Sequence, residues 1–311
     1  MHNKGRAAIK AIVIMGGLAF ALLYLGSLAL QQSLTPNPQQ RVTPRPNASP
    51  MNSARAMADF DRFAAWGPRP RGSDALVRQK AYTEAQLRAA QWRIAAAVQA
   101  QTNGGEHLLA YRGAKQRAQV LLATRYDTPA NTGGKAIGAN QTAGAALLLE
   151  LARALPTDWA DGTLWLAWLD TGGDDAAAGR ALREALAPHM AERPAAVIYV
   201  AGLGDCYLEA PADAAAPAWL RRIVRDTAQR LGYGRHFPDR AAAMQGPHTV
   251  FREAGVPSLA LIDPVHGGRL FEESAAIEAD PRAEVCADSL QAAGDVIYHA
   301  IPAVYGYLMR H

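Results

Sequence analysis

The segment TLWLAWLDTGGDD, residues Thr163 to Asp175, decides the fold of this chain. Its first seven residues are almost wholly apolar, which is the pattern of a strand buried on both faces of a sheet. The next six include three carboxylates and two glycines, so a polar loop follows the strand directly. Ligands of α/β proteins collect at the carboxyl ends of such strands, and we therefore look for chemistry in this loop and its neighbours.

The same pattern continues in both directions along the chain. Five further apolar runs predict strands: Ile94 to Ala100, His107 to Arg112, Gln119 to Thr124, Ala196 to Val200 and Ser258 to Ile262. The segments between and after them predict helices: Asp74 to Ala90, Ala143 to Leu155, Ala176 to Met190, Pro217 to Leu231, Pro247 to Ala254 and Ser289 to Met309. This alternation predicts one α/β domain, a three-layer sandwich with a mostly parallel, mixed central sheet.

The amino-terminal fifty residues have a different character. Residues 11–30 are uncharged and apolar over the length of a membrane-spanning helix, and Lys4, Arg6 and Lys10 precede them. We expect a cytoplasmic tail (1–10), a transmembrane signal anchor (11–30), a Pro-rich linker (31–50) and an exported domain (51–311). This places the protein in the cell inner membrane as a single-pass protein, with a periplasmic or otherwise extracytoplasmic domain. A cleavable signal peptide ending near Ala29 is the alternative.

Charge and cysteine content exclude several functional classes. The chain has 311 residues and a formal charge of +4, but five of its cations lie in the acid-free leader, which leaves residues 51–311 at −1. We therefore predict no nucleic-acid partner. The two cysteines, Cys206 and Cys286, exclude a cysteine-rich scaffold and leave open whether they form a disulfide.

Six segments, in this order, resemble the zinc-dependent aminopeptidases and glutaminyl cyclases. They are GPRPRGSDA at Gly67 to Ala75, ATRYDTPANTGG at Ala123 to Gly134, GANQTAGAALLLELARAL at Gly138 to Leu155, LWLAWLDTGGDD at Leu164 to Asp175, HTVFREAGVPSLALI at His248 to Ile262 and EADPRAEVCADSLQAAGDVI at Glu278 to Ile297. The resemblance covers nearly everything from Ala54 onward. It implies an exported α/β fold and, in an intact member, a zinc ion with an open position for water or substrate and a glutamate that acts as general base on that water or shuttles the proton in cyclisation.

The matched positions of the metal ligands carry other residues. The resemblance places the first histidine of the family at Arg125, its bridging aspartate at Gln141 and its paired glutamates at Gly172 and Gly173. A further aspartate falls on Ala201, and the last histidine falls near Ala276. Arginine and glutamine do not replace imidazole and carboxylate at zinc, so we expect no metal and no other cofactor. Asp127, His248 and Asp280 remain from the surroundings of the site.

Several residues allow two interpretations each. Asp174 and Asp175 are either a displaced catalytic pair or the cap and first-turn charge of the following helix. His248 is either catalytic or a hydrogen-bonded structural histidine. Arg125 and Asp127 either pair with each other at a strand end or meet separate partners.

We therefore predict a degenerate, non-catalytic relative of these enzymes that binds a peptide terminus or an envelope protein. Its binding residues are expected to be Arg125, Asp127, Gln141, Asp170 and His248. The alternative is an active metallo-aminopeptidase or glutaminyl-peptide cyclotransferase that uses zinc in a rearranged site, with Asp174, Asp175 and His248 as catalytic candidates. A third possibility is a purely architectural domain.

Overall fold

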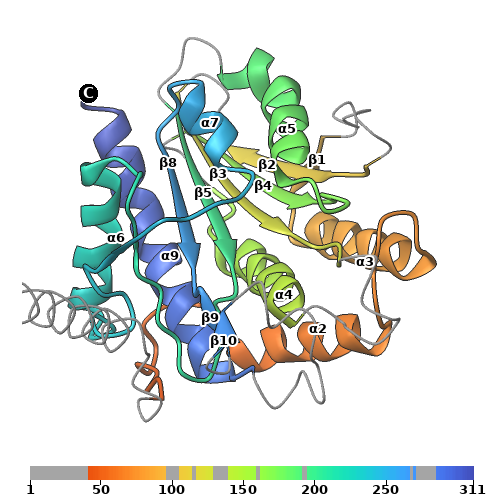
Figure 1. The fold of residues 1–311 in the computed structure, drawn as a ribbon, viewed down its shortest axis with the longest axis horizontal. Helices are drawn as coiled ribbons and strands as arrows, with labels where there is room; N and C mark the ends of the chain where they lie inside the picture. The colour runs from red at the N-terminus through yellow and green to blue at the C-terminus, as the bar shows by residue number, and fades with distance from the viewer. Residues whose placement is uncertain are drawn as a thin grey trace, which may run out of the picture. The chain divides into compact units, whose positions relative to one another are not determined.

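The central sheet has six strands in the order β1-β2-β4-β3-β5-β8 (Figure 1). The structure is a computed structural model that describes residues 41–95, 105–113, 117–128, 139–158, 162–190, 195–266, 269–270 and 285–311. Strands β3, β4, β5 and β8 run parallel, and β2 and β1 add an antiparallel edge. The strands are β1 (Arg93–Ile94), β2 (Leu108–Gly113), β3 (Ala118–Arg125), β4 (Gly162–Leu169), β5 (Ala195–Ala201) and β8 (Ser258–Ile262).

Helices cover both faces of this sheet, so the predicted mixed sheet between two helical layers is confirmed. The helices are α2 (Ser53–Ala65), α3 (Asp74–Ala89), α4 (Ala139–Ala154), α5 (Asp175–Met190), α6 (Ala218–Arg230), α7 (Thr249–Glu253) and α9 (Ala287–Leu308). Leu164, Leu166 and Trp168 of β4 join the larger core under α2, α4 and α9. The intervening Trp165 and Leu169 join the smaller core under α5 and α7. This alternation is the two-residue period of a strand buried on both faces.

Most predicted elements agree with the structure to within a few residues, and β8 agrees at both ends. The strand predicted from Ile94 begins as β1, and residues 96–100 of that prediction lie outside the described residues. Helix α2 was not predicted, although its cap is visible in the sequence: the side chain of Asn52 accepts a 2.9 Å hydrogen bond from the backbone N–H of Arg55. Four two-residue strands were also missed, namely β6 (Ala212–Asp213), β7 (Ala241–Ala242), β9 (Val265–His266) and β10 (Arg269–Leu270).

The described part of the predicted linker, residues 41–50, packs against the domain. Asp295, fully buried in α9, accepts hydrogen bonds from the Ser49 hydroxyl at 2.5 Å and the Tyr233 hydroxyl at 2.8 Å. The Tyr233 oxygen in turn accepts the backbone N–H of Arg45 at 2.8 Å, and Val42 is buried. The chain therefore enters the domain along a fixed path next to the end of α6.

The predicted membrane segment, residues 11–30, lies outside the described residues. Within the part of the chain that is described, no helix has the length and apolar character needed to cross a bilayer.

Cys206 and Cys286 form a disulfide, with their Cα atoms 4.8 Å apart. The bond connects the loop after β5 to the residue that precedes α9. The backbone pairs at the same place, because Asp205 and Val285 form an isolated bridge and the N–H of Cys286 donates to the carbonyl of Gly204. The open question about these two cysteines is thereby answered.

Candidate functional site

The four parallel strands end at one edge of the sheet, and their following loops carry most of the predicted site residues (Figure 1). Arg125 is the last residue of β3, and Asp127 lies two residues beyond it. The loop after β4 runs from Asp170 to Asp174 and leads into α5 at Asp175. Tyr199 lies near the end of β5.

Arg125 forms a two-point ion pair with Asp127. Its Nε lies 2.9 Å from Oδ1 of Asp127, and its Nη2 lies 3.2 Å from Oδ2. The third guanidinium nitrogen, Nη1, lies 3.9 Å from Oδ1 of Asp175. The arginine side chain is only 13% exposed. Burial alone would lower the pKa of Arg125, but Asp127 and Asp175 outweigh that effect and raise the pKa, so the cation is fixed.

Asp127 is fully buried and accepts hydrogen bonds from the loop after β4 as well. The backbone N–H of Thr171 donates to Oδ1 at 3.0 Å, and that of Gly172 donates to Oδ2 at 2.9 Å. One carboxylate therefore joins the end of β3 to the loop after β4. The buried negative charge of Asp127 is thus compensated by the guanidinium of Arg125, which bonds it at two points, and by two backbone amides.

Asp174 and Asp175 are adjacent in sequence but differ in role. Asp174 is exposed and caps α5, because its Oδ1 accepts the N–H of Ala177 at 2.8 Å. Asp175 turns toward Arg125, and its Oδ1 is buried without a hydrogen-bond partner among the described residues. Burial raises the pKa of Asp175; Arg125 opposes this rise and Asp127 adds to it. The capping interpretation thus holds for Asp174, and Asp175 belongs to the Arg125 cluster.

His248 belongs to a second, fully buried network. Its ring stacks on Tyr199 with 5.8 Å between centroids, and its Nε2 lies 3.3 Å from Oδ2 of Asp213. Asp213 also accepts the N–H of Ala260 at 3.1 Å and pairs with Arg252 at 3.3 Å. Burial acts to raise the pKa of Asp213, but His248 and the backbone amides outweigh it and lower the pKa. Among the described residues, neither ring nitrogen of His248 has a hydrogen-bond partner, so the stacking on Tyr199 and the approach to Asp213 are the contacts that hold the ring.

Tyr199 lies between the two networks. Burial raises the pKa of its hydroxyl, and the charge of Asp175 adds to the rise while Arg125 opposes it. The phenol therefore stays neutral, and its ring stacks on that of His248.

Asp170 belongs to a third network, on the side of α3. Its Oδ1 accepts from Nε of Arg71 at 3.1 Å, and its Oδ2 accepts the N–H of Glu106 at 3.1 Å. Its own N–H donates to Nδ1 of His107, whose pKa burial lowers to about 4. The carboxylate is buried and already satisfied by a guanidinium and an amide.

The remaining predicted positions are not among the contacts described above, or lie outside the described residues. Gln141 is buried in the first turn of α4, and Ala201 is buried at the end of β5. Ala276 and Asp280 lie outside the described residues.

The described residues do not fit a zinc ion. Zinc needs several deprotonated oxygen, nitrogen or sulfur ligands directed at one point. In the part of the chain that the structure describes, no three His, Cys, Asp or Glu side chains form such a group. Where Asp127 and Asp175 approach each other, the group between them is the guanidinium of Arg125, which cannot ligate a metal.

Sequence reasoning missed Tyr199, Arg71 and Asp213. Tyr199 is the only residue with a polar side chain in the run AAVIYV, which was a usable signal. Arg71 lies in the segment GPRPRGSDA, but the pattern gave no partner for it. Asp213 lies in an alanine-rich segment, and nothing local in the sequence indicates that it reaches His248.

Comparison with solved structures shows which proteins share this fold. A glutaminyl cyclase from an Acidobacteriales bacterium superposes with a TM-score of 0.69 at 20% identity, over 86% of this chain and 98% of the other. The Porphyromonas gingivalis glutaminyl cyclase gives 0.66 at 20% identity, over 82% and 99%. A leucine aminopeptidase precursor from Bacteroides thetaiotaomicron gives 0.66 at 15% identity, over 81% and 97%. No protein-family model and no curated protein sequence matches the chain. The resemblance seen in the six sequence segments is thus confirmed at the level of the fold.

Proposed function

We propose that this protein is an exported, membrane-tethered domain that binds a peptide amino terminus without transforming it. One observation carries the proposal: the guanidinium of Arg125 lies between Asp127 and Asp175, where the relatives implied by the sequence resemblance place a metal ligand. A permanent cation at this point repels a divalent ion and uses the carboxylates that would otherwise attract one.

The charge that remains at the site favours a cationic ligand. Arg125 carries one positive charge and faces two carboxylates, so the three side chains together carry −1. Asp127 is satisfied by its partners, whereas Oδ1 of Asp175 accepts no hydrogen bond from a described residue. A protonated α-amino group supplies the missing charge and donor. The free amino terminus of a peptide or of an envelope protein therefore fits better than a carboxylate.

The disulfide supports the exported location. Such bonds persist in oxidising compartments, and the protein has no other cysteine. Together with the apolar segment at residues 11–30, this favours a single-pass inner-membrane protein with an extracytoplasmic domain.

The alternative remains an active aminopeptidase or glutaminyl cyclase with a rearranged zinc site. It needs Asp127, Asp170, Asp174, Asp175 and His248 to act together. Their contacts place them in separate environments: Asp170 with Arg71, His248 with Asp213, and Asp174 at a helix cap. This separation favours binding over catalysis.

A single experiment distinguishes the two functions. The full chain in nanodiscs is titrated calorimetrically with a peptide that begins with glutamine, with and without added zinc, and the peptide is then analysed by mass spectrometry. We expect binding with the peptide recovered intact in both conditions. Loss of ammonia from the peptide would establish a cyclase, and loss of its first residue would establish an aminopeptidase. Absence of binding would contradict the proposal.

Matched controls test the role of Asp175. An N-acetylated form of the peptide lacks the cationic amine and should bind at least about tenfold more weakly, because a charge-assisted hydrogen bond is lost. Asp175→Asn should have a similar effect. Asp174→Asn removes the neighbouring charge but keeps a capping side chain, and it should bind like the unaltered protein.

A further inference from the structure

Helix α6 and the loop that follows it carry a net positive charge. Residues 218–240 contain six arginines and two aspartates, a net charge of +4. Residues 51–311 as a whole carry −1, so the rest of the domain carries −5. Leu220, Val224 and Thr227 pack inward from α6, and the outward half of the helix carries its arginines. The net charge of −1 for residues 51–311 therefore conceals a surface that is locally basic.

Residues 41–50, which lead into the domain, contribute two more arginines. Gly232 has a φ of +79° just beyond α6, and a Cβ atom there would collide with the guanidinium of Arg45. Arg45 thus lies directly on the carboxyl-terminal end of α6, where the helix dipole favours a cation. Arg41 lies over the ring of Tyr207, 5.9 Å from its centroid. We call the exposed set Arg41, Arg45, Arg222, Arg230 and Arg235 the arginine face.

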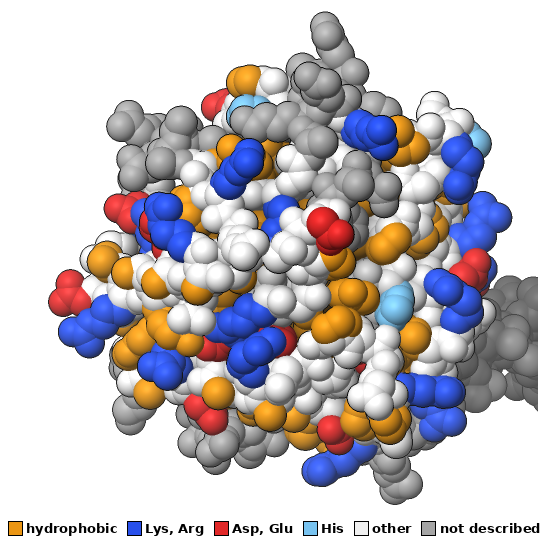
Figure 2. Space-filling model, turned by 180° about the vertical axis from the view of Figure 1, so that it is seen from behind, with side chains coloured by type: hydrophobic (Ala, Val, Ile, Leu, Met, Phe, Trp, Pro, Cys, Tyr) orange, Lys and Arg blue, Asp and Glu red, His pale blue; other side chains and the backbone are white. Residues whose placement is uncertain are grey.

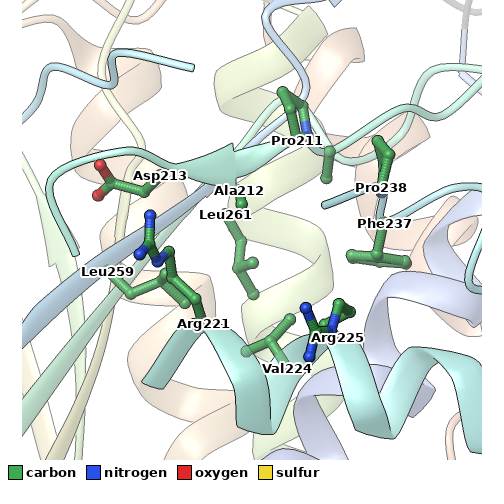
Figure 3. Close-up of a pocket in the computed structure, with 11 residues that line it drawn as sticks. Pro211, Ala212, Asp213, Arg221, Val224, Arg225, Phe237, Pro238, Leu259 and Leu261 are labelled. Atoms are coloured by element: carbon green, nitrogen blue, oxygen red, sulfur yellow. The ribbon is translucent and has the colours of Figure 1, made fainter. Parts of the chain in front are cut away.

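A small pocket with apolar lining residues borders α6, the helix that carries part of the arginine face. Figure 3 shows Arg221 and Arg225, also from α6, beside a small pocket lined by Val224, Phe237 and Leu261. Seen from behind in Figure 2, blue side chains line the right-hand edge, which is the α6 side of Figure 1. A helix with arginines outward and apolar side chains at its margin is typical of a surface that rests on anionic lipid.

We propose that the arginine face docks on the anionic phospholipid headgroups of the membrane that anchors the chain. Two observations converge: the charge of this surface is complementary to phosphate, and Arg41 and Arg45, which contribute to it, belong to the predicted linker between the anchor and the domain. Arginines near an anionic membrane attract it additively, so five of them can hold a tethered domain in one orientation. The inference rests on the membrane tether of the proposed function.

Arginine footprinting on the full chain tests this docking. The protein is reconstituted in nanodiscs of phosphatidylcholine alone or with roughly one phosphatidylglycerol in three lipids, labelled with phenylglyoxal and analysed by mass spectrometry. We expect labelling of Arg222, Arg230 and Arg235 to fall about threefold or more in the anionic discs, and to recover in high salt because the attraction is screened. Arg78, Arg88 and Arg180, exposed on α3 and α5, should label equally in both lipids.

Equal labelling of the arginine face in the two lipids would overturn the docking proposal. Protection of Arg78, Arg88 and Arg180 to the same extent would overturn it too, because the effect would then not be specific to this surface. Failure of the chain to insert into phosphatidylcholine discs would instead contradict the tether. A triple variant, R222Q/R230Q/R235Q, should lose the lipid-dependent protection of Arg41 and Arg45. The charge-matched control R78Q/R88Q/R180Q should keep it.

Discussion

Arg125 shows how one side chain changes what a strand end can do. A guanidinium that bonds Asp127 at two points and faces Asp175 turns a pair of carboxylates into a mostly neutralised cluster. Asp175 is the member that remains under-compensated, since its Oδ1 is buried without a hydrogen bond from any described residue. A group in this state is expected to reduce folding stability in order to serve a ligand.

The burial of this carboxylate predicts a pH-dependent effect of Asp175→Asn. Burial raises the pKa of Asp175 above its ordinary 3.8, so the folded state disfavours the charged form. The variant should therefore be more stable than the unaltered protein at neutral pH. Its advantage should shrink as the pH falls through the raised pKa and vanish below 3.8. Chemical denaturation at a series of pH values measures the difference. A gain in stability that is constant with pH, or that is equally large in Asp174→Asn, would contradict the conclusion that the buried charge of Asp175 destabilises the fold.

At the residue scale the sequence predicted local contacts better than distant ones. The Arg125–Asp127 pair and the Asp174 cap involve residues two or three positions apart, so backbone geometry alone suggested them. The approach of Asp175 to Arg125 and the stacking of Tyr199 on His248 join different loops and strands. Such contacts depend on which strand ends lie next to each other in the sheet. No local sequence pattern carries that information.

At the element scale, buried strands were the most predictable features. Strands β3, β4 and β8 are apolar along nearly their whole length because helices cover both faces, and their limits follow from that run. The two-residue strands β6 and β7 have no such signal, since Ala212–Asp213 and Ala241–Ala242 pair only because the loops that carry them meet. Helix α2 was missed because an asparagine cap is a weaker mark than an apolar run.

The start of α5 gives a prediction at this scale. Asp174→Ala removes the side chain that accepts the N–H of Ala177, and it should cost about 1 kcal/mol of unfolding free energy. Asp174→Ser retains a capping oxygen and should cost much less. Urea titration of the two variants provides the comparison. An equal loss in both would show that charge at this position, rather than the cap, stabilises the helix.

At the scale of the whole molecule, the disulfide joins two regions that are 80 residues apart in sequence. A cross-link of this span restricts the unfolded chain, and its loss is expected to cost about 4 kcal/mol. The double variant C206S/C286S should therefore unfold at a lower denaturant concentration than the oxidised protein. Adding dithiothreitol to the unaltered protein should produce the same shift and should leave the double variant unchanged. No shift on reduction would show that the bond adds nothing to stability.

The positive charge at the centre of the candidate site belongs to a side chain, the guanidinium of Arg125, and not to a bound metal ion. Chelators cannot extract it, competing metals cannot displace it, and starvation for zinc cannot empty it. Under the proposed function, a domain built in this way is ready as soon as it folds, whatever the trace-element supply of its compartment. On the same proposal, a proteome-wide screen by metal depletion would pass over this protein, even while it affected zinc-dependent proteins of the same fold.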